Sequence, residues 1–91
     1  MELKWTQKGL SDLARLYEHL AVVNQPAAAR VVQQLTAAPA TLLTNPRIGE
    51  RLEEFEPRDV RRIVVGQYEM RYEIAGSTVY LLRLWHTREA R

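Results

Sequence analysis

The sequence lacks cysteine, and it has only four glycines, four prolines and one phenylalanine among its 91 residues. Without cysteine, no disulfide, thiolate metal site or cysteine nucleophile can form, and a reducing compartment is expected. No stretch approaches the roughly 18 consecutive apolar residues that a membrane-spanning helix needs. Residues 1–5 also lack the charged start and apolar run of a signal peptide. We therefore expect a cytoplasmic protein.

The sequence also lacks a large excess of either charge: it has 13 lysines and arginines and 11 aspartates and glutamates, which gives a formal net charge of +2. A nucleic-acid-binding protein usually carries a denser basic stripe. Apart from Lys4 and Lys8, these cations are all arginines, whose planar guanidinium makes bidentate contacts with carboxylate or phosphate groups. The length and the 46% hydrophobic content predict one globular domain, residues 1–91.

The first half of the chain has the patterns of one strand and two helices. Residues 2–6 alternate polar and apolar side chains, which predicts a short strand. Apolar residues then recur every three or four positions, which predicts an amphipathic helix over residues 7–22. A second apolar stripe follows Pro26 and is interrupted at Pro39, where the helix should end or kink. The short connection predicts an antiparallel helix hairpin.

The second half has the pattern of strands joined by short turns. Gly66-Gln67 and Gly76-Ser77 fit two-residue hairpin turns. The segments around them are β-branched, alternating, or almost continuously apolar, as expected for paired strands. The expected strands are residues 60–65, 68–74 and 78–85, with a further short strand at residues 51–55.

These elements predict an α+β domain in the order β-α-α-β-β-β. We expect an antiparallel sheet of three to four strands with an N-terminal strand, and the helical hairpin packed on one face. This arrangement buries the apolar stripes of both helices against one face of the sheet.

Several segments carry a family resemblance through their order and spacing. They are the opening of the second helix, Asn24-Gln25-Pro26-Ala27-Ala28-Ala29, the turn Asn45-Pro46-Arg47-Ile48-Gly49, the strand pair at residues 60–63 and 68–74, and the ending Leu81-Leu82-Arg83-Leu84-Trp85-His86-Thr87-Arg88-Glu89. Together they resemble the RelE/ParE superfamily of toxins from type II toxin–antitoxin systems. The resemblance implies that an antitoxin wraps the toxin. It also implies one of two targets, because RelE-like members cleave messenger RNA in the ribosomal A site and ParE-like members poison DNA gyrase.

Within that resemblance, the residues favour the ParE-like branch. Cleaving RNA without a metal needs a base, an acid and cations around the phosphate. The strand position that carries a phosphate-binding arginine in RelE-like toxins is Glu69 here, and no tyrosine or histidine follows His86. We therefore predict a toxin without catalytic residues that inhibits DNA gyrase by binding and is neutralised by a cognate antitoxin.

Two alternatives stay open. The first is a RelE-like, ribosome-dependent messenger RNA endoribonuclease with Arg83, His86 and Arg88 as its charged set. The second is a family member that still binds its antitoxin but has lost toxicity. Self-association into a homodimer, or into a larger toxin–antitoxin assembly, is equally open.

The candidate contact residues are basic side chains on the strands and near the C-terminus. Arg71 shares a strand face with Glu69 and Glu73, which predicts a ladder of ion pairs. Arg83 interrupts an apolar strand and needs a partner, for which Glu69 or Glu73 is the candidate. For His86, a surface histidine is favoured over an acid–base catalyst. The candidate residues for contact with gyrase, DNA or antitoxin are Arg62, Arg71, Arg83, His86, Arg88 and Arg91.

Two further readings concern aromatic residues and cofactors. Trp5, Tyr68, Tyr72 and Trp85 could form a base-stacking platform, but core packing is favoured. The sequence contains neither metal-ligand spacing nor a glycine-rich phosphate loop. We therefore expect no metal and no cofactor.

Overall fold

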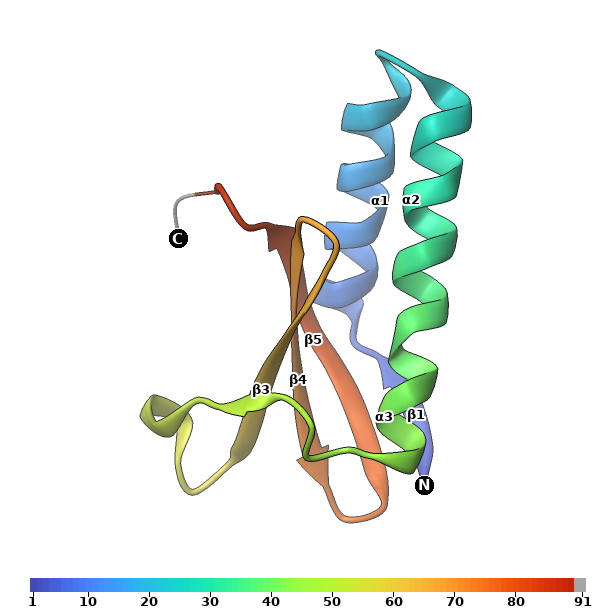
Figure 1. Ribbon diagram of the computed structural model, residues 1–91. Helices are drawn as coiled ribbons and strands as arrows, with labels where there is room; N and C mark the ends of the chain where they lie inside the picture. The colour runs from blue at the N-terminus through green and yellow to red at the C-terminus, as the bar shows by residue number, and fades with distance from the viewer. Residues whose placement is uncertain (90–91) are drawn as a thin grey trace.

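The computed structural model describes residues 1–89 and has two layers, a sheet and a helix hairpin (Figure 1). The two long helices lie side by side against the sheet, while β2 and β3 lie at its far edge (Figure 1). None of the described helices has the length and apolar character to cross a membrane. The elements are β1 (Glu2–Trp5), α1 (Gln7–Ala21), α2 (Gln25–Ala37), α3 (Thr41–Thr44), β2 (Glu50–Arg51), β3 (Asp59–Val65), β4 (Tyr68–Ala75) and β5 (Thr78–His86), with 3-10 turns at Ala38–Ala40 and Glu53–Phe55.

The predicted helix hairpin is confirmed, and its ends have clear causes. Thr6 caps α1 by accepting a hydrogen bond from Gly9 N at 3.0 Å, and Asn24 caps α2 by accepting one from Ala27 N at 3.0 Å. The second helix ends at Ala37, immediately before the 3-10 turn that contains Pro39.

The sheet has the strand order β1-β5-β4-β3-β2. The antiparallel meander of β3, β4 and β5 is confirmed, and both predicted two-residue turns connect it. Gly66 and Gly76 have φ angles of 62° and 61°, a region that glycine enters without steric cost. The N-terminal strand joins the opposite edge in parallel orientation, paired with β5, so the sheet is mixed. The short strand expected at residues 51–55 forms only at Glu50–Arg51, because a 3-10 turn follows.

The core lies between the sheet and the hairpin. Met70 and Tyr72 of β4 are fully buried there, together with Leu35 of α2. Glu69, Arg71 and Glu73 alternate with the core residues along β4, so they belong to the opposite, helix-free face of the sheet. We call this face the open face.

The aromatic residues divide between the two faces. Tyr72 is in the core, and Trp5 and Tyr68 pack against it, as core packing predicts. Trp85 is also buried, but its ring lies under the guanidinium groups of Arg71 and Arg83. Trp85 therefore does not face the helices.

A bulge in β5 decides which of its side chains enter the core. Arg71 of β4 is paired with Arg83, whereas the next residue, Tyr72, is paired with Leu81, so Leu82 is an extra residue in β5. This shift lets Leu81 and Leu84 both face the core while Arg83 turns to the open face. Arg83 therefore interrupts the apolar sequence of β5 without entering the core.

Candidate functional site

The open face carries three arginines side by side. Arg62, Arg71 and Arg83 are register partners on the adjacent strands β3, β4 and β5. We call these three residues the arginine row. Like charges directly opposite one another on neighbouring strands repel, so the row requires carboxylates to neutralise it.

At the β3 end of the row, Glu50 and Glu69 supply those carboxylates. Arg62 Nε donates to Glu50 Oε1 at 2.9 Å, and Arg62 Nη1 donates to Glu69 Oε1 at 3.2 Å. The hydrogen bond and charge of Glu50, followed by those of Glu69, raise the pKa of Arg62. The other Glu69 oxygen, Oε2, lies 3.6 Å from Arg71 Nη2. Glu69 is only 2% exposed, so its charge is enclosed by the two arginines.

The expected ion pairing along β4 is therefore confirmed for Arg71 with Glu69, but Glu73 has a different main partner. Arg58, in the loop before β3, donates to Glu73 through Nε at 3.0 Å and Nη2 at 2.7 Å. This hydrogen bond to Arg58 lowers the pKa of Glu73 and raises that of Arg58.

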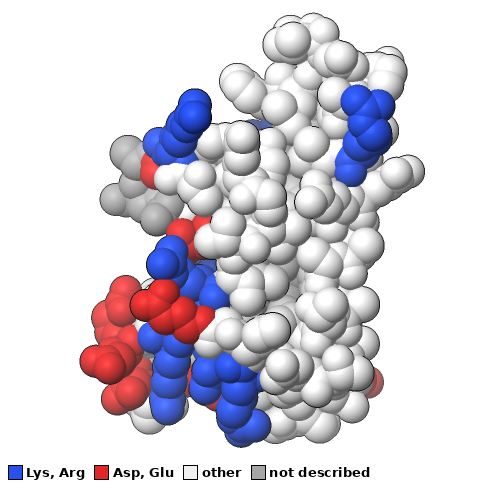
Figure 2. Space-filling model, in the orientation of Figure 1, with Lys and Arg blue, Asp and Glu red and all other residues white. Residues whose placement is uncertain are grey.

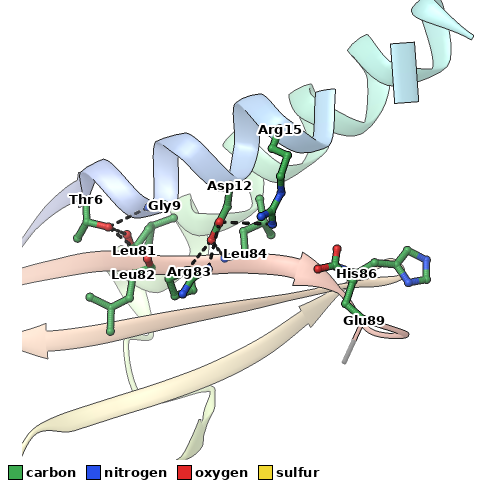
Figure 3. Close-up of polar contacts among 10 residues, drawn as sticks. All are labelled: Thr6, Gly9, Asp12, Arg15, Leu81, Leu82, Arg83, Leu84, His86 and Glu89. Atoms are coloured by element: carbon green, nitrogen blue, oxygen red, sulfur yellow. Dashed lines mark hydrogen bonds and ion pairs between the residues drawn. The ribbon is translucent and has the colours of Figure 1, made fainter. Parts of the chain in front are cut away.

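At the β5 end, the partner of Arg83 is Asp12 of α1, so the expectation of Glu69 or Glu73 was wrong. Arg83 Nε donates to Asp12 Oδ2 at 2.8 Å and Nη2 donates to Oδ1 at 3.3 Å (Figure 3). This hydrogen bonding raises the pKa of Arg83. Asp12 also lies 3.5 Å from Arg15 Nη2 and is 5% exposed. A contact between residues 71 positions apart could not be found by reading one strand at a time.

Asp12 also binds a backbone N–H at the edge of β5, which explains why its side chain is buried. The strand β1 pairs with β5 only as far as Trp5 opposite Leu81, and the chain then turns into α1. Within residues 1–89, the edge of β5 beyond Leu81 therefore has no neighbouring strand. Asp12 Oδ2 accepts a hydrogen bond from Leu84 N on this edge at 2.9 Å, and Thr6 Oγ1 donates to Leu81 O at 2.9 Å (Figure 3).

Arg71, in the middle of the row, is held by aromatic rings. Its guanidinium carbon lies 4.8 Å from the ring centre of Trp85 and 5.3 Å from that of Phe55, both cation–π distances. Its Nε atom is buried and has no hydrogen-bond partner among residues 1–89. The ring contacts and the Glu69 ion pair therefore fix Arg71 while leaving donor capacity unused.

A cleft of about 540 Å³ opens beside Arg71 and Arg83. Charged side chains gather on the side of the molecule where β2 and β3 lie, whereas the surface over the helix hairpin is almost uncharged in the same view (Figure 2). For α2 the sequence explains this contrast, because Arg30 is the only lysine, arginine, aspartate or glutamate between residues 20 and 46. We call the cleft the basic cleft, and its lining residues are Thr6, Gln7, Lys8, Phe55, Arg58, Arg71, Leu82 and Arg83.

The structure does not bring His86 and Arg88 into the basic cleft. They line a separate hollow of about 350 Å³ with Leu16, His19 and Leu20 of α1, which we call the C-terminal hollow. In it, His86 Nδ1 accepts from Arg88 N at 3.0 Å, and His86 Nε2 lies 3.1 Å from Gln67 Oε1. Both ring nitrogens are therefore engaged. The remaining candidate, Arg91, lies outside the described residues.

Sequence reasoning missed most of the residues that organise the open face. One sequence feature could have indicated a structural role for Asp12: it is an acidic residue between Leu10 and Leu13 of the apolar stripe of α1. Lys8, Phe55 and Arg58 come from a helix start and a loop, where no periodic pattern predicts a position. Within residues 1–89, no group of three histidine or acidic side chains is arranged to hold a metal ion.

Comparisons with known proteins define the class. A solved structure described as the chromosomal ParDE TA system from P. aeruginosa matches this fold with a TM-score of 0.79 and 26% identity, covering 94% of this chain and 95% of that one. A family model for the ParE toxin of the type II toxin–antitoxin system parDE matches residues 3–91. The chain belongs to this family of toxins.

A curated relative carries a name from the other branch. The protein named Toxin RelE2 of Caulobacter vibrioides is 29% identical over 85 residues, which cover 93% of each chain. The sequence-based assignment to the RelE/ParE superfamily is confirmed by these matches, and so is the α+β fold.

Proposed function

We propose that this ParE-family toxin stops growth by binding DNA gyrase, and that a cognate antitoxin neutralises it. Its own side chains make or break no covalent bond in this action. The observation that carries the proposal is the family match over residues 3–91, taken with the separation of Arg83 from His86. A nuclease needs its cations and its proton-transfer groups around one phosphate, and here they line two different hollows.

The state of His86 supports the same proposal. A general base needs a ring nitrogen that can reach the substrate proton. In this chain Nδ1 accepts from the backbone of Arg88 and Nε2 lies in hydrogen-bond contact with Gln67. These contacts hold the turn after β5, which is a structural role for a histidine at the end of a strand.

One observation favours a second candidate, ribosome-dependent cleavage of messenger RNA. The chain is 29% identical to a protein named Toxin RelE2. Under this candidate the basic cleft would hold the phosphate, and a group outside Arg83, His86 and Arg88 would have to move the proton.

A supercoiling assay with purified gyrase and relaxed plasmid tests the proposal directly. We expect increasing toxin to block supercoiling and to accumulate cleaved DNA–gyrase complex. Primer extension on messages from a translating extract should show no new ends. Lys8→Gln, an exposed change in the basic cleft, should weaken gyrase inhibition, whereas Arg30→Gln, an exposed change on α2, serves as the matched control.

Other results would support one of the alternative functions. New message ends that require ribosomes, with supercoiling unaffected, would establish the nuclease. Normal growth after induction in a naive bacterial host, with supercoiling and messages both unaffected, would identify a member that has lost toxicity.

A further inference from the structure

The basic cleft combines cations from four parts of the chain. Lys8 comes from the start of α1, Arg58 from the loop before β3, Arg71 from β4 and Arg83 from β5. No aspartate or glutamate is among the described residues that line it. Three of these cations are paired with carboxylates that lie outside the lining, Arg58 with Glu73, Arg71 with Glu69 and Arg83 with Asp12, so the cleft gathers hydrogen-bond donors more than net charge.

The guanidinium groups keep donors that the fold does not use. A guanidinium has five N–H donors. Arg58 uses two of them on Glu73, and Arg83 uses two on Asp12, so each retains three. The Nε atom of Arg71 is buried and has no hydrogen-bond partner in the part of the chain that the structure describes, so a ligand would meet the exposed fifth of this side chain and not Nε. No ion pair joins Lys8 to a described carboxylate.

The three guanidinium groups are also fixed in place before any ligand arrives. Two carboxylates, Glu73 and Asp12, hold Arg58 and Arg83 through paired hydrogen bonds. Arg71 is stacked on two rings and is 20% exposed at its side chain. Side chains that are already immobilised lose little conformational entropy on binding, which favours a ligand that matches their geometry.

A phosphate group matches this geometry better than a carboxylate does. Guanidinium forks bind both anions. A backbone phosphate has two non-bridging oxygens, as a carboxylate has, but its four oxygens point to the corners of a tetrahedron, whereas the two oxygens of a carboxylate lie in one plane. Donors from three guanidinium groups and an ammonium can therefore approach a phosphate from several sides. The ring of Phe55 forms part of the wall and supplies a surface on which a base can stack. Glu69 does not oppose such a ligand, because it is enclosed by Arg62 and Arg71 and does not line the cleft.

We propose that the basic cleft is a binding site for a phosphate group in the backbone of a DNA strand. Lys8, Arg58, Arg71 and Arg83 contact the phosphate, and Phe55 contacts the neighbouring nucleotide. The choice of DNA as the source of the phosphate rests on the proposed action at gyrase, an enzyme that holds DNA. The recognition of phosphate rests on the cleft alone.

The test measures binding by the purified full chain, without gyrase. A fluorescein-labelled single strand of about 12 nucleotides is titrated with protein in about 20 mM and about 200 mM salt, and anisotropy is recorded. We compare Lys8→Gln/Arg58→Gln with the control Arg30→Gln/Arg47→Gln, which removes the same charge from exposed positions outside the cleft. Circular dichroism verifies that each variant is folded, and Lys8→Gln alone provides a variant that breaks no described ion pair.

We expect the cleft variant to bind about tenfold more weakly, with a salt dependence reduced by roughly one phosphate contact. The control should change affinity by less than about twofold, since its charges lie away from the bound strand and are screened. Equal losses in the two variants, or no binding by the wild-type chain in low salt, would overturn the proposal.

Two competitors identify the chemistry and the source of the anion. Inorganic pyrophosphate should displace the strand at lower concentration than a glutamate peptide of equal charge. Equal displacement by the peptide would overturn phosphate recognition. Pyrophosphate that binds as tightly as the whole strand would show that the site takes free phosphate and not DNA. A chain that binds the strand but leaves gyrase active would refute the proposed function alone, and one that inhibits gyrase without binding the strand would refute this inference alone.

Discussion

Asp12→Ala is the substitution whose effect the structure defines most fully. The Asp12 carboxylate accepts hydrogen bonds both from the side chain of Arg83 and from the backbone N–H of Leu84 at the edge of β5. The change removes the acceptor for the buried N–H of Leu84, and an unsatisfied buried donor costs about 1–3 kcal/mol. It also removes the partner of Arg83, whose side chain is 40% exposed, so water replaces that pair at a cost of only about 0–1 kcal/mol. We expect a total loss of about 1–4 kcal/mol.

That loss would be a large fraction of the stability of a domain this small, which is about 5–15 kcal/mol. Each kcal/mol lowers the Tm of a domain of 60–100 residues by roughly 4–8 °C, so Asp12→Ala should lower Tm by roughly 4–30 °C. Urea unfolding followed by circular dichroism gives the free energy of unfolding, and a thermal melt gives Tm.

Three further variants separate the two roles of Asp12. Asp12→Asn removes the charge and keeps an oxygen that can accept from Leu84 N, so it should cost only about 0–1 kcal/mol. Arg83→Ala also keeps the Leu84 hydrogen bond but leaves the buried Asp12 carboxylate with Arg15 as its cation, so it should cost more than Asp12→Asn. Glu18→Ala, an exposed change on the same helix, should stay within about 0.5 kcal/mol of the wild type. If Asp12→Ala costs no more than Asp12→Asn, the argument that Asp12 satisfies the open edge of β5 is refuted.

Three other substitutions test separate parts of the fold. Tyr72→Phe removes a buried hydroxyl that donates to Pro46 O at 2.7 Å and accepts from Gly49 N at 2.9 Å, so it should cost about 1–3 kcal/mol in urea unfolding; an unchanged midpoint would contradict this role. Gly9→Ala would place a methyl group 2.6 Å from Leu81 O, so α1 must move from β5, and Tm should fall by at least about 4 °C; an unchanged or higher Tm would show that this approach is not tight. Glu73→Gln tests the lowered pKa of Glu73: a carboxyl whose pKa is lower in the folded state contributes stability above its unfolded pKa of about 4.3 and loses it as the pH falls through the folded pKa. The stability difference between wild type and Glu73→Gln should therefore shrink between about pH 5 and pH 3, and a constant difference would contradict the ion pair with Arg58.

Much of the fold could be predicted because local patterns repeat along each element. The apolar spacing of α1, the proline at Pro39 and the glycine turns at Gly66 and Gly76 each act within a few residues, so the helix hairpin and the meander were predicted. The parallel pairing of β1 with β5 was not, because it joins residues more than 70 positions apart. The same limit explains why the candidate set held Arg62, Arg71 and Arg83 but missed Asp12, Lys8 and Arg58.

The sequence by itself determined the order of the elements, the side-chain pattern of β4 and the family resemblance, since each of these depends on residues that are close together in the sequence. Only the tertiary structure decided where Arg83 points. A strand read in strict alternation places Leu81 and Arg83 on one face, but the extra residue Leu82 shifts the register and sends Arg83 to the open face. Asp12 of α1 lies over the part of the β5 edge that no strand covers in the described residues. There it accepts hydrogen bonds from the guanidinium of Arg83 and from the N–H of Leu84.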